Sequence, residues 1–172
     1  AVFGKKSYGN DGVSVTFRLD KRAVWGDGTP ITTKDVLFTW KVGKHKLTGV
    51  SDYEIFRRIS NIEILDSHSF IMHLDQQTCD FANLDNFQLL PAHIEAKNFS
   101  IPAEYRNRSA YETETTNPGL WFGPYVVNKV VPGSHVIFEQ NKFWWGRKPH
   151  FKRITVLAIE NTASITANLL AG

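Results

Sequence analysis

The stretch WGDGTPITTKDV at residues 25–36 decides how the chain enters its first helix. Its Asp-Gly pair at 27–28 is typical of a tight turn. Thr32 and Asp35 stand three positions apart, as in a capping box, where each side chain binds a backbone amide at the helix start. The sequence therefore predicts a loop and then a helix. The helical face that we expect to be buried comprises Val36, Leu37, Trp40 and Lys44.

A second stretch, NPGLWFGPY at residues 117–125, combines turn residues with two aromatic rings. Its proline and glycines set an unusual backbone conformation. Trp121 and Phe122 then have two interpretations. Either both rings anchor the loop in a core, or the loop borders a cleft where rings and free backbone groups contact an extended ligand. The sequence leaves both interpretations open.

Apolar and polar residues alternate at 13–19, which predicts a half-buried strand. The runs 59–65 and 70–74 predict a hairpin, as do 125–131 and 135–140. A helix is expected at 81–90, and Pro91 either starts a second short helix that extends to Lys97 or kinks the first one. The polar stretch 98–120 is expected to be a lobe crossing or an exposed loop. The last expected elements are an aromatic loop at 143–146, a strand at 154–159 and a helix from Thr162 to Leu170. Because strands and helices do not alternate strictly, we expect a mixed α/β (α+β) fold.

The composition is that of an ordinary globular protein, with 42% hydrophobic and 22% charged residues in a chain of 172. The net charge of +3 is spread over short, interrupted basic runs, so nucleic-acid binding is not expected. Cys79 is the only cysteine, and no intrachain disulfide can form. No signal segment opens the chain, and both ends resemble the interior of a longer protein. We expect an excised piece.

The sequence contains no recognisable catalytic or metal-binding pattern. The six histidines lack the spacing of metal ligands. Asp75, Asp80 and Asp85 recur every five residues, which fits neither one helix face nor one strand face. There is no Gly-x-Ser-x-Gly turn, and Cys79 has no basic neighbour that would activate its thiol. We expect a protein that is not an enzyme, with no catalytic residues, no metal and no cofactor.

Together and in this order, residues 17–19, 25–36 and 117–125 resemble the extracellular solute-binding proteins of oligopeptide-type ABC importers, family 5, which include the dipeptide, oligopeptide and nickel groups. Four further stretches match in order, at residues 70–81, 89–94, 141–149 and 163–172. The chain departs from the family pattern at 119–123, where GLWFG replaces a small, hydroxyl-rich VGTG. Ligand contacts at that position are therefore expected to differ.

The resemblance implies part of a lobe like that of type II periplasmic binding proteins, with its extra subdomain, truncated. We expect a smaller subdomain at residues 1–100, a crossing segment at 101–116 and part of the main lobe at 117–172. The second ligand-binding lobe is expected to be absent. An incomplete sheet exposes a strand edge, and we expect a dimer that covers this edge.

The function that the resemblance implies is capture of a periplasmic or extracellular peptide, by closure of two lobes, for delivery to the permease subunits of an ABC importer. Nickel complexes, sugars and opines are open alternatives as solutes. The implied location is the periplasm, or the outer surface of a Gram-positive cell through a membrane anchor. A sensor or chaperone-like receptor on the same fold is a second hypothesis, and a hydrolase without a recognisable motif is a third.

We expect the ligand to contact Asn117, Trp121 and Phe122, because the resemblance places this loop at the cleft. The loop glycines allow a close backbone approach, and the rings offer stacking area. Tyr53 is an outlying fourth candidate, in a stretch where similar proteins can have an aromatic residue that faces the cleft.

Overall fold

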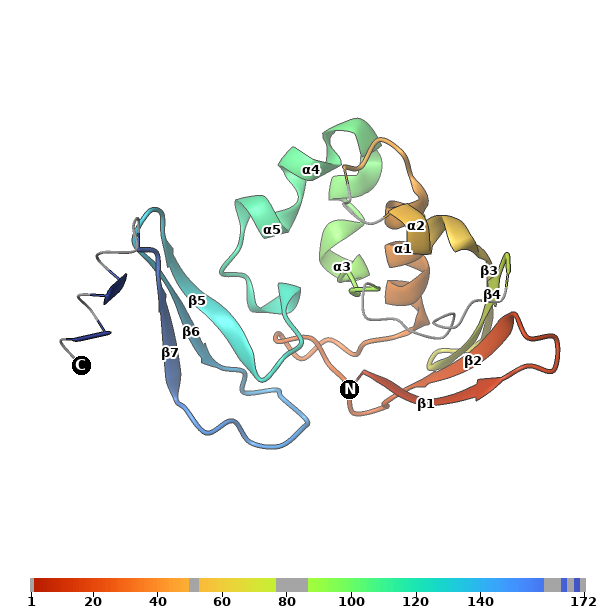
Figure 1. Ribbon diagram of the computed structural model, residues 1–172, viewed down its shortest axis with the longest axis horizontal. Coiled ribbons are helices and arrows are strands. Elements are labelled where there is room, and N and C mark those ends of the chain that lie inside the picture. Colours follow the sequence, from red (N-terminus) through yellow and green to blue (C-terminus); the bar gives the residue numbers. More distant parts are fainter. Residues whose placement is uncertain (1, 50–52, 77–86, 160–164, 167–168, 171–172) are drawn as a thin grey trace.

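The computed structural model describes residues 2–49, 53–76, 87–159, 165–166 and 169–170. It contains two antiparallel sheets, and the helices lie between and above them (Figure 1). The mixed α/β class expected from the sequence is the class observed. Among the described residues, no helix combines the length and the apolar character needed to cross a membrane.

The first sheet has the strand order β1-β2-β4-β3. Its strands are β1 (Phe3–Tyr8), β2 (Ser14–Leu19), β3 (Ile59–Asp66) and β4 (Ser69–Leu74). Phe17 pairs with Phe70 across β2 and β4, and their rings stack 5.4 Å apart. The predictions of β2 and of the β3–β4 hairpin are confirmed. Strand β1 was not predicted from the sequence.

Helix α1 (Thr33–Lys44) starts with the predicted capping box. The Thr32 hydroxyl accepts from the Lys34 amide at 3.3 Å, and Asp35 Oδ2 accepts from the Thr32 amide at 2.8 Å. Of the face predicted from the sequence, Val36 is buried in the main core, and Leu37 and Trp40 are half-buried and pack against it, whereas Lys44 is exposed. The buried residues are Thr33, Asp35, Val36, Thr39, Val42 and Gly43.

The helix is buried on this face because a second layer covers it. The Phe56 ring of α2 (Tyr53–Arg58) packs so closely on Gly43 that a Cβ there would lie 2.4 Å from the ring. Farther along the chain, the Leu90 amide donates to Thr39 Oγ1 at 2.8 Å, and the Ala92 amide donates to Asp35 Oδ1 at 2.9 Å. Polar residues of α1 therefore hold the segment that follows.

The region from Ala92 to Leu120 is a series of single helical turns. These are α3 (Ala92–Glu95), η1 (Asn98–Ser100), η2 (Pro102–Glu104), α4 (Tyr105–Arg108), α5 (Ala110–Thr113) and η3 (Pro118–Leu120). Pro91 precedes α3, so it starts a short helix as one alternative predicted. The exposed loop expected within 98–120 is a wrong prediction, because Phe99, Tyr105, Ala110 and Leu120 are buried. A crossing role for 101–116 stays a prediction, as do the boundaries 1–100 and 117–172.

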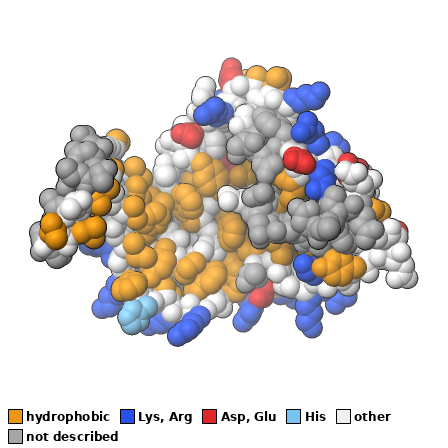
Figure 2. Space-filling view, viewed as in Figure 1, with side chains coloured by type: hydrophobic (Ala, Val, Ile, Leu, Met, Phe, Trp, Pro, Cys, Tyr) orange, Lys and Arg blue, Asp and Glu red, His pale blue; other side chains and the backbone are white. Residues whose placement is uncertain are grey.

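The second sheet has the order β5-β6-β7, with β5 (Tyr125–Val131), β6 (His135–Gln140) and β7 (Arg153–Leu157). The β5–β6 hairpin and the third strand agree with the sequence predictions. Val156 and Leu157 of the edge strand β7 are more than half exposed, and hydrophobic side chains run from this sheet towards the middle of the molecule (Figure 2). The dimer expected at this edge stays a prediction. The helix predicted at 81–90 lies mostly outside the described residues, as does Thr162.

We predict that Asp35→Ala destabilises the fold more than Thr32→Ala. Loss of the Thr32 cap should lower the free energy of unfolding by about 0.5–2 kcal/mol. Loss of Asp35 leaves the amides of both Thr32 and Ala92 without their carboxylate, which should cost about 2 kcal/mol or more. Urea unfolding measures both values, with the exposed Lys34→Ala as control. Equal effects of the two variants would mean that the bond to Ala92 contributes nothing.

Candidate functional site

Two loops that are far apart in the sequence, at residues 25–28 and 117–122, lie against each other. The Gly26 amide donates to the Trp121 carbonyl at 2.7 Å. A Cβ on Gly26 would lie 2.5 Å from the Pro118 carbonyl oxygen, so only glycine allows this approach. Gly119 is equally confined, because its Cβ would lie 2.5 Å from Asp27 Oδ2. We call this contact region, with His93, the junction.

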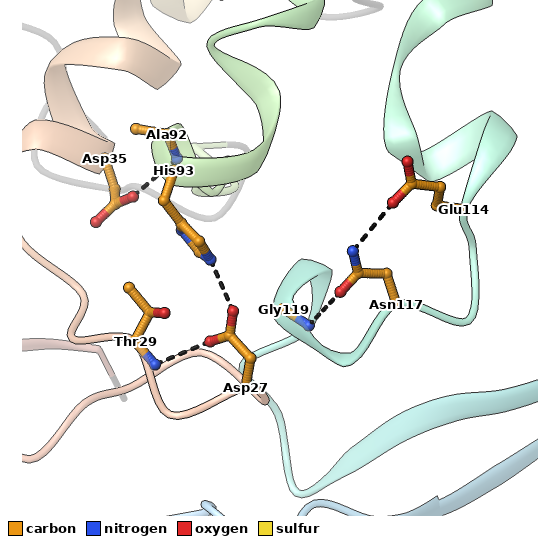
Figure 3. A network of polar contacts seen from close by, with 8 residues as sticks. All are labelled: Asp27, Thr29, Asp35, Ala92, His93, Glu114, Asn117 and Gly119. Atoms are coloured by element: carbon orange, nitrogen blue, oxygen red, sulfur yellow. Dashed lines mark hydrogen bonds and ion pairs between the residues drawn. The ribbon is translucent and has the colours of Figure 1, made fainter.

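Asp27 ties the junction to α3. Its Oδ1 accepts from the Thr29 amide at 2.8 Å, and its Oδ2 lies 2.9 Å from His93 Nε2 (Figure 3). Partial burial acts to raise the pKa of Asp27, but the hydrogen bonds from Thr29 and His93 outweigh it and lower the pKa. The carboxylate form of Asp27 is therefore the form that the junction stabilises.

A second carboxylate, that of Asp35, holds the segment that precedes His93. Burial raises the pKa of Asp35, although hydrogen bonds from Thr32 and Ala92 oppose the shift. Because Ala92 directly precedes His93, the cap of α1 also positions the histidine that meets Asp27 (Figure 3). The first helix and the junction thus form one chain of polar contacts.

Asn117 shapes the turn that carries the two aromatic rings. Its Oδ1 accepts from the Gly119 amide at 3.0 Å, and its Nδ2 donates to Glu114 Oε2 at 3.1 Å (Figure 3). Both polar atoms of the side chain thus have partners within the loop. A ligand contact by the Asn117 amide would have to replace or share one of these bonds.

Trp121 is half-buried, and hydrogen bonds hold both its side chain and its backbone. Its indole Nε1 donates to the Thr115 carbonyl at 3.0 Å, while its own carbonyl accepts from Gly26. The ring meets Tyr111 edge to face at 5.5 Å, and the Tyr111 hydroxyl donates to the Leu120 carbonyl. Trp121 therefore anchors the loop. A ligand could contact only the part of its side chain that remains exposed.

Phe122 joins the second sheet to the main core. Its ring meets the fully buried Trp25 edge to face at 5.2 Å. Trp145, from the loop after β6, packs on the same core. The structure thus brings Asn117, Trp121 and Phe122 together in one segment. Tyr53 opens α2, but its side chain lies outside the described residues, and its role stays a prediction.

Sequence reasoning missed two contributors to this site. Asp27 and His93 are 66 positions apart, and no local spacing signals their contact. Tyr111 sits in a polar stretch that offered no periodicity. The Asp27–His93 pair is engaged in holding loops together, and among the described residues no group of three or more His, Cys, Asp or Glu could hold a metal ion.

The sequence model of the bacterial extracellular solute-binding proteins, family 5 (middle region), matches residues 5–172. The chain belongs to this family. A Brucella ovis protein that bears the name of an ABC transporter peptide-binding protein is 27% identical over 163 residues, covering 94% of this chain and 30% of that protein. The match thus extends over both loops of the junction.

Solved structures of two proteins share the fold. The oligopeptide-binding protein AppA from Bacillus subtilis, in complex with a nonapeptide, superposes with a TM-score of 0.86 at 20% identity, covering 100% of this chain and 33% of AppA. NikZ from Campylobacter jejuni, in complex with Ni(L-His), gives 0.83 at 23% identity, with coverages of 100% and 33%. The chain spans about a third or less of the proteins it matches, which agrees with part of a type II binding-protein lobe.

Gly26→Ala should destabilise the fold of this protein. The new methyl group would collide with the Pro118 carbonyl and with Val126, and overpacking of this kind costs about 1–3 kcal/mol. Gly123→Ala is the matched control, because the nearest atom to its Cβ would be 3.8 Å away. Thermal and urea unfolding compare the two. Equal stability of both variants would refute the close approach.

The junction should also weaken in acid. Since the folded state lowers the pKa of Asp27, its contribution is present above the ordinary value of 3.8 and is lost as pH falls through the lowered pKa. The stability difference between the native protein and Asp27→Asn should therefore be largest near pH 7 and shrink below about pH 4. Urea unfolding across this range measures it. A difference that stays constant with pH would contradict the ionised contact.

Proposed function

We propose that the chain is part of the substrate-binding component of a bacterial ABC importer, which captures a peptide outside the cytoplasmic membrane. The observation that carries this proposal is the family match over residues 5–172, with both signature loops docked on each other as one junction. The protein would bind and deliver its solute without chemical change.

A peptide is the solute class that we favour. The Brucella ovis relative is named for peptide binding, and the AppA structure contains a nonapeptide. The NikZ structure contains Ni(L-His), so a nickel complex is the alternative with a specific observation behind it. In the described part of this chain, the half-exposed aromatic rings of the junction favour stacking and apolar contact over metal ligation.

The mechanism that we propose is closure of two lobes around the solute, with binding shifting the population towards the closed form. The junction would serve as a preformed wall of the binding site, because Trp121, Phe122 and Asn117 are each held in place by contacts with other residues of the chain. A wall that is already ordered loses little conformational entropy on binding. Tyr53 remains an outlying candidate for the same surface.

The location and partners follow from the same proposal. Family 5 consists of extracellular solute-binding proteins, so we place the full-length protein in the periplasm or on an anchored extracellular site. Its partners would be the solute and the permease subunits of the importer.

Trp121→Ala in the full-length protein should weaken peptide binding by about 1–3 kcal/mol, since aromatic anchors carry much of the binding energy of an interface. Trp121→Phe keeps a ring but loses the bond to Thr115, so it should retain most of the affinity while losing stability. Calorimetric titration and thermal unfolding of both variants give the two quantities. Unchanged affinity of Trp121→Ala, with a comparable loss of stability, would make Trp121 a core anchor only.

The importer proposal itself is tested by titrating peptide mixtures into the full-length protein and into the 172-residue chain. We expect binding by the full-length protein and weak or no binding by the chain alone, because lobe closure supplies the second wall. Micromolar binding by the 172-residue chain would mean that the site is misplaced. Absence of peptide binding by the full-length protein would reject the peptide as solute.

A further inference from the structure

An open cleft is lined by the loop between β6 and β7 and by the start of β5. Its volume is about 810 Å³. The residues that line it include Tyr125, Trp144, Arg147, Lys148, Pro149 and His150. None of these residues belongs to the junction, so the cleft is a separate feature of the surface.

The backbone around the cleft is fixed by side-chain hydrogen bonds. The Trp144 indole donates to the Arg147 carbonyl at 2.8 Å, and Gly146 fits against the same ring, where a Cβ would lie 2.4 Å from it. The Tyr125 hydroxyl donates to the Phe151 carbonyl at 2.9 Å and accepts from the Phe151 amide at 3.2 Å. The loop is therefore a built frame with aromatic walls.

The segment that provides Arg147 and Lys148 to the cleft is the most positive stretch of the sequence. Residues 142–153 contain five cations and no acidic residue, so the rest of the chain has a formal net charge of −2. The cations are Lys142, Arg147, Lys148, Lys152 and Arg153. On the face shown in Figure 2, Lys and Arg side chains flank a histidine at the lower edge of the second sheet. The sequence shows this basic run, but not that Arg147 and Lys148 within it line a cleft.

Of these cations, Arg147 and Lys148 line the cleft. Arg153 pairs with Glu139 at 2.8 Å, and Lys142 lies over the Phe143 ring. Arg147 and Lys148 are exposed, and within the described part of the chain no carboxylate lies within ion-pair distance of either. A guanidinium can bind a carboxylate with two parallel hydrogen bonds, and a neighbouring ammonium adds a second point of attraction.

We propose that this cleft docks an acidic segment of a protein partner, with Arg147 and Lys148 binding its carboxylates and Trp144 packing on its backbone. The partner identity rests on the proposed function, under which the segment belongs to the permease that receives the solute. A small free anion would stay solvated at such an open rim and gain little. A flat lipid surface could not enter the cleft to reach the Trp144 ring, whereas an extended chain can.

The test uses the full-length protein and a labelled synthetic peptide of alternating glutamate and serine, with a glutamine–serine peptide for comparison. Fluorescence anisotropy at low ionic strength should show binding of the glutamate peptide only. The double variant Arg147→Glu/Lys148→Glu should lose about tenfold or more in affinity. Lys5→Glu/Lys6→Glu, on the exposed strand β1, changes the net charge equally and should bind as the native protein does.

Three results would overturn the proposal. They are equal binding of both peptides, equal loss in both double variants, and binding only to phosphatidylglycerol vesicles, which would make the patch a membrane contact. The proposed function is tested separately by titration of the solute. A protein that binds no peptide solute, but binds the glutamate peptide through Arg147 and Lys148, would reject the peptide as solute and support the acidic-segment site.

Discussion

The hydrogen bond from the Gly26 amide to the Trp121 carbonyl brings two loops, almost a hundred residues apart in sequence, to backbone contact. Such contact is open only to residues without a Cβ, and Gly26 and Gly119 provide it from the two sides. In the same region Asp27 lies beside His93. The contact links the first sheet and helix α1 to the second sheet, because the first loop lies between β2 and α1 and the second loop leads directly into β5.

Aromatic side chains extend the same constraint. Phe122 precedes β5 and Trp145 follows β6, and both pack on the core of the first sheet. The Phe143 ring lies so close to Gly28 that a Cβ there would be 3.1 Å from it. The loop after β6 is thus fixed on its inner side by the junction, while its outer side holds the cleft with Arg147 and Lys148. Under the proposed function, one rigid frame would present a solute wall on one side and a partner surface on the other.

The sequence predicted those elements whose side chains alternate or repeat at a fixed spacing. Strand β2, the two hairpins and the capping box of α1 are of this kind. Strand β1 was missed because only Phe3 is even partly buried, so its residues show no alternation. The turns between Phe99 and Leu120 are too short for a helical period, although all of them except η2 bury a residue. The Asp27–His93 contact depends on tertiary structure alone. Asn117, Trp121 and Phe122 were selected because the family resemblance places their loop at the cleft, but nothing in the sequence indicated their anchoring partners Glu114, Thr115 and Trp25.

Hydrogen exchange of the Gly26 amide is the most direct test of the junction. If this bond holds the two parts of the fold together, the amide should exchange only on global unfolding, as slowly as the amides of β2 and β4. The exposed turn at Gly133, which has no atom near its Cβ position, gives the fast reference in the same spectrum. Exchange of Gly26 at the rate of that turn would show that the loops separate while the sheets stay folded, and would contradict the central role of the junction.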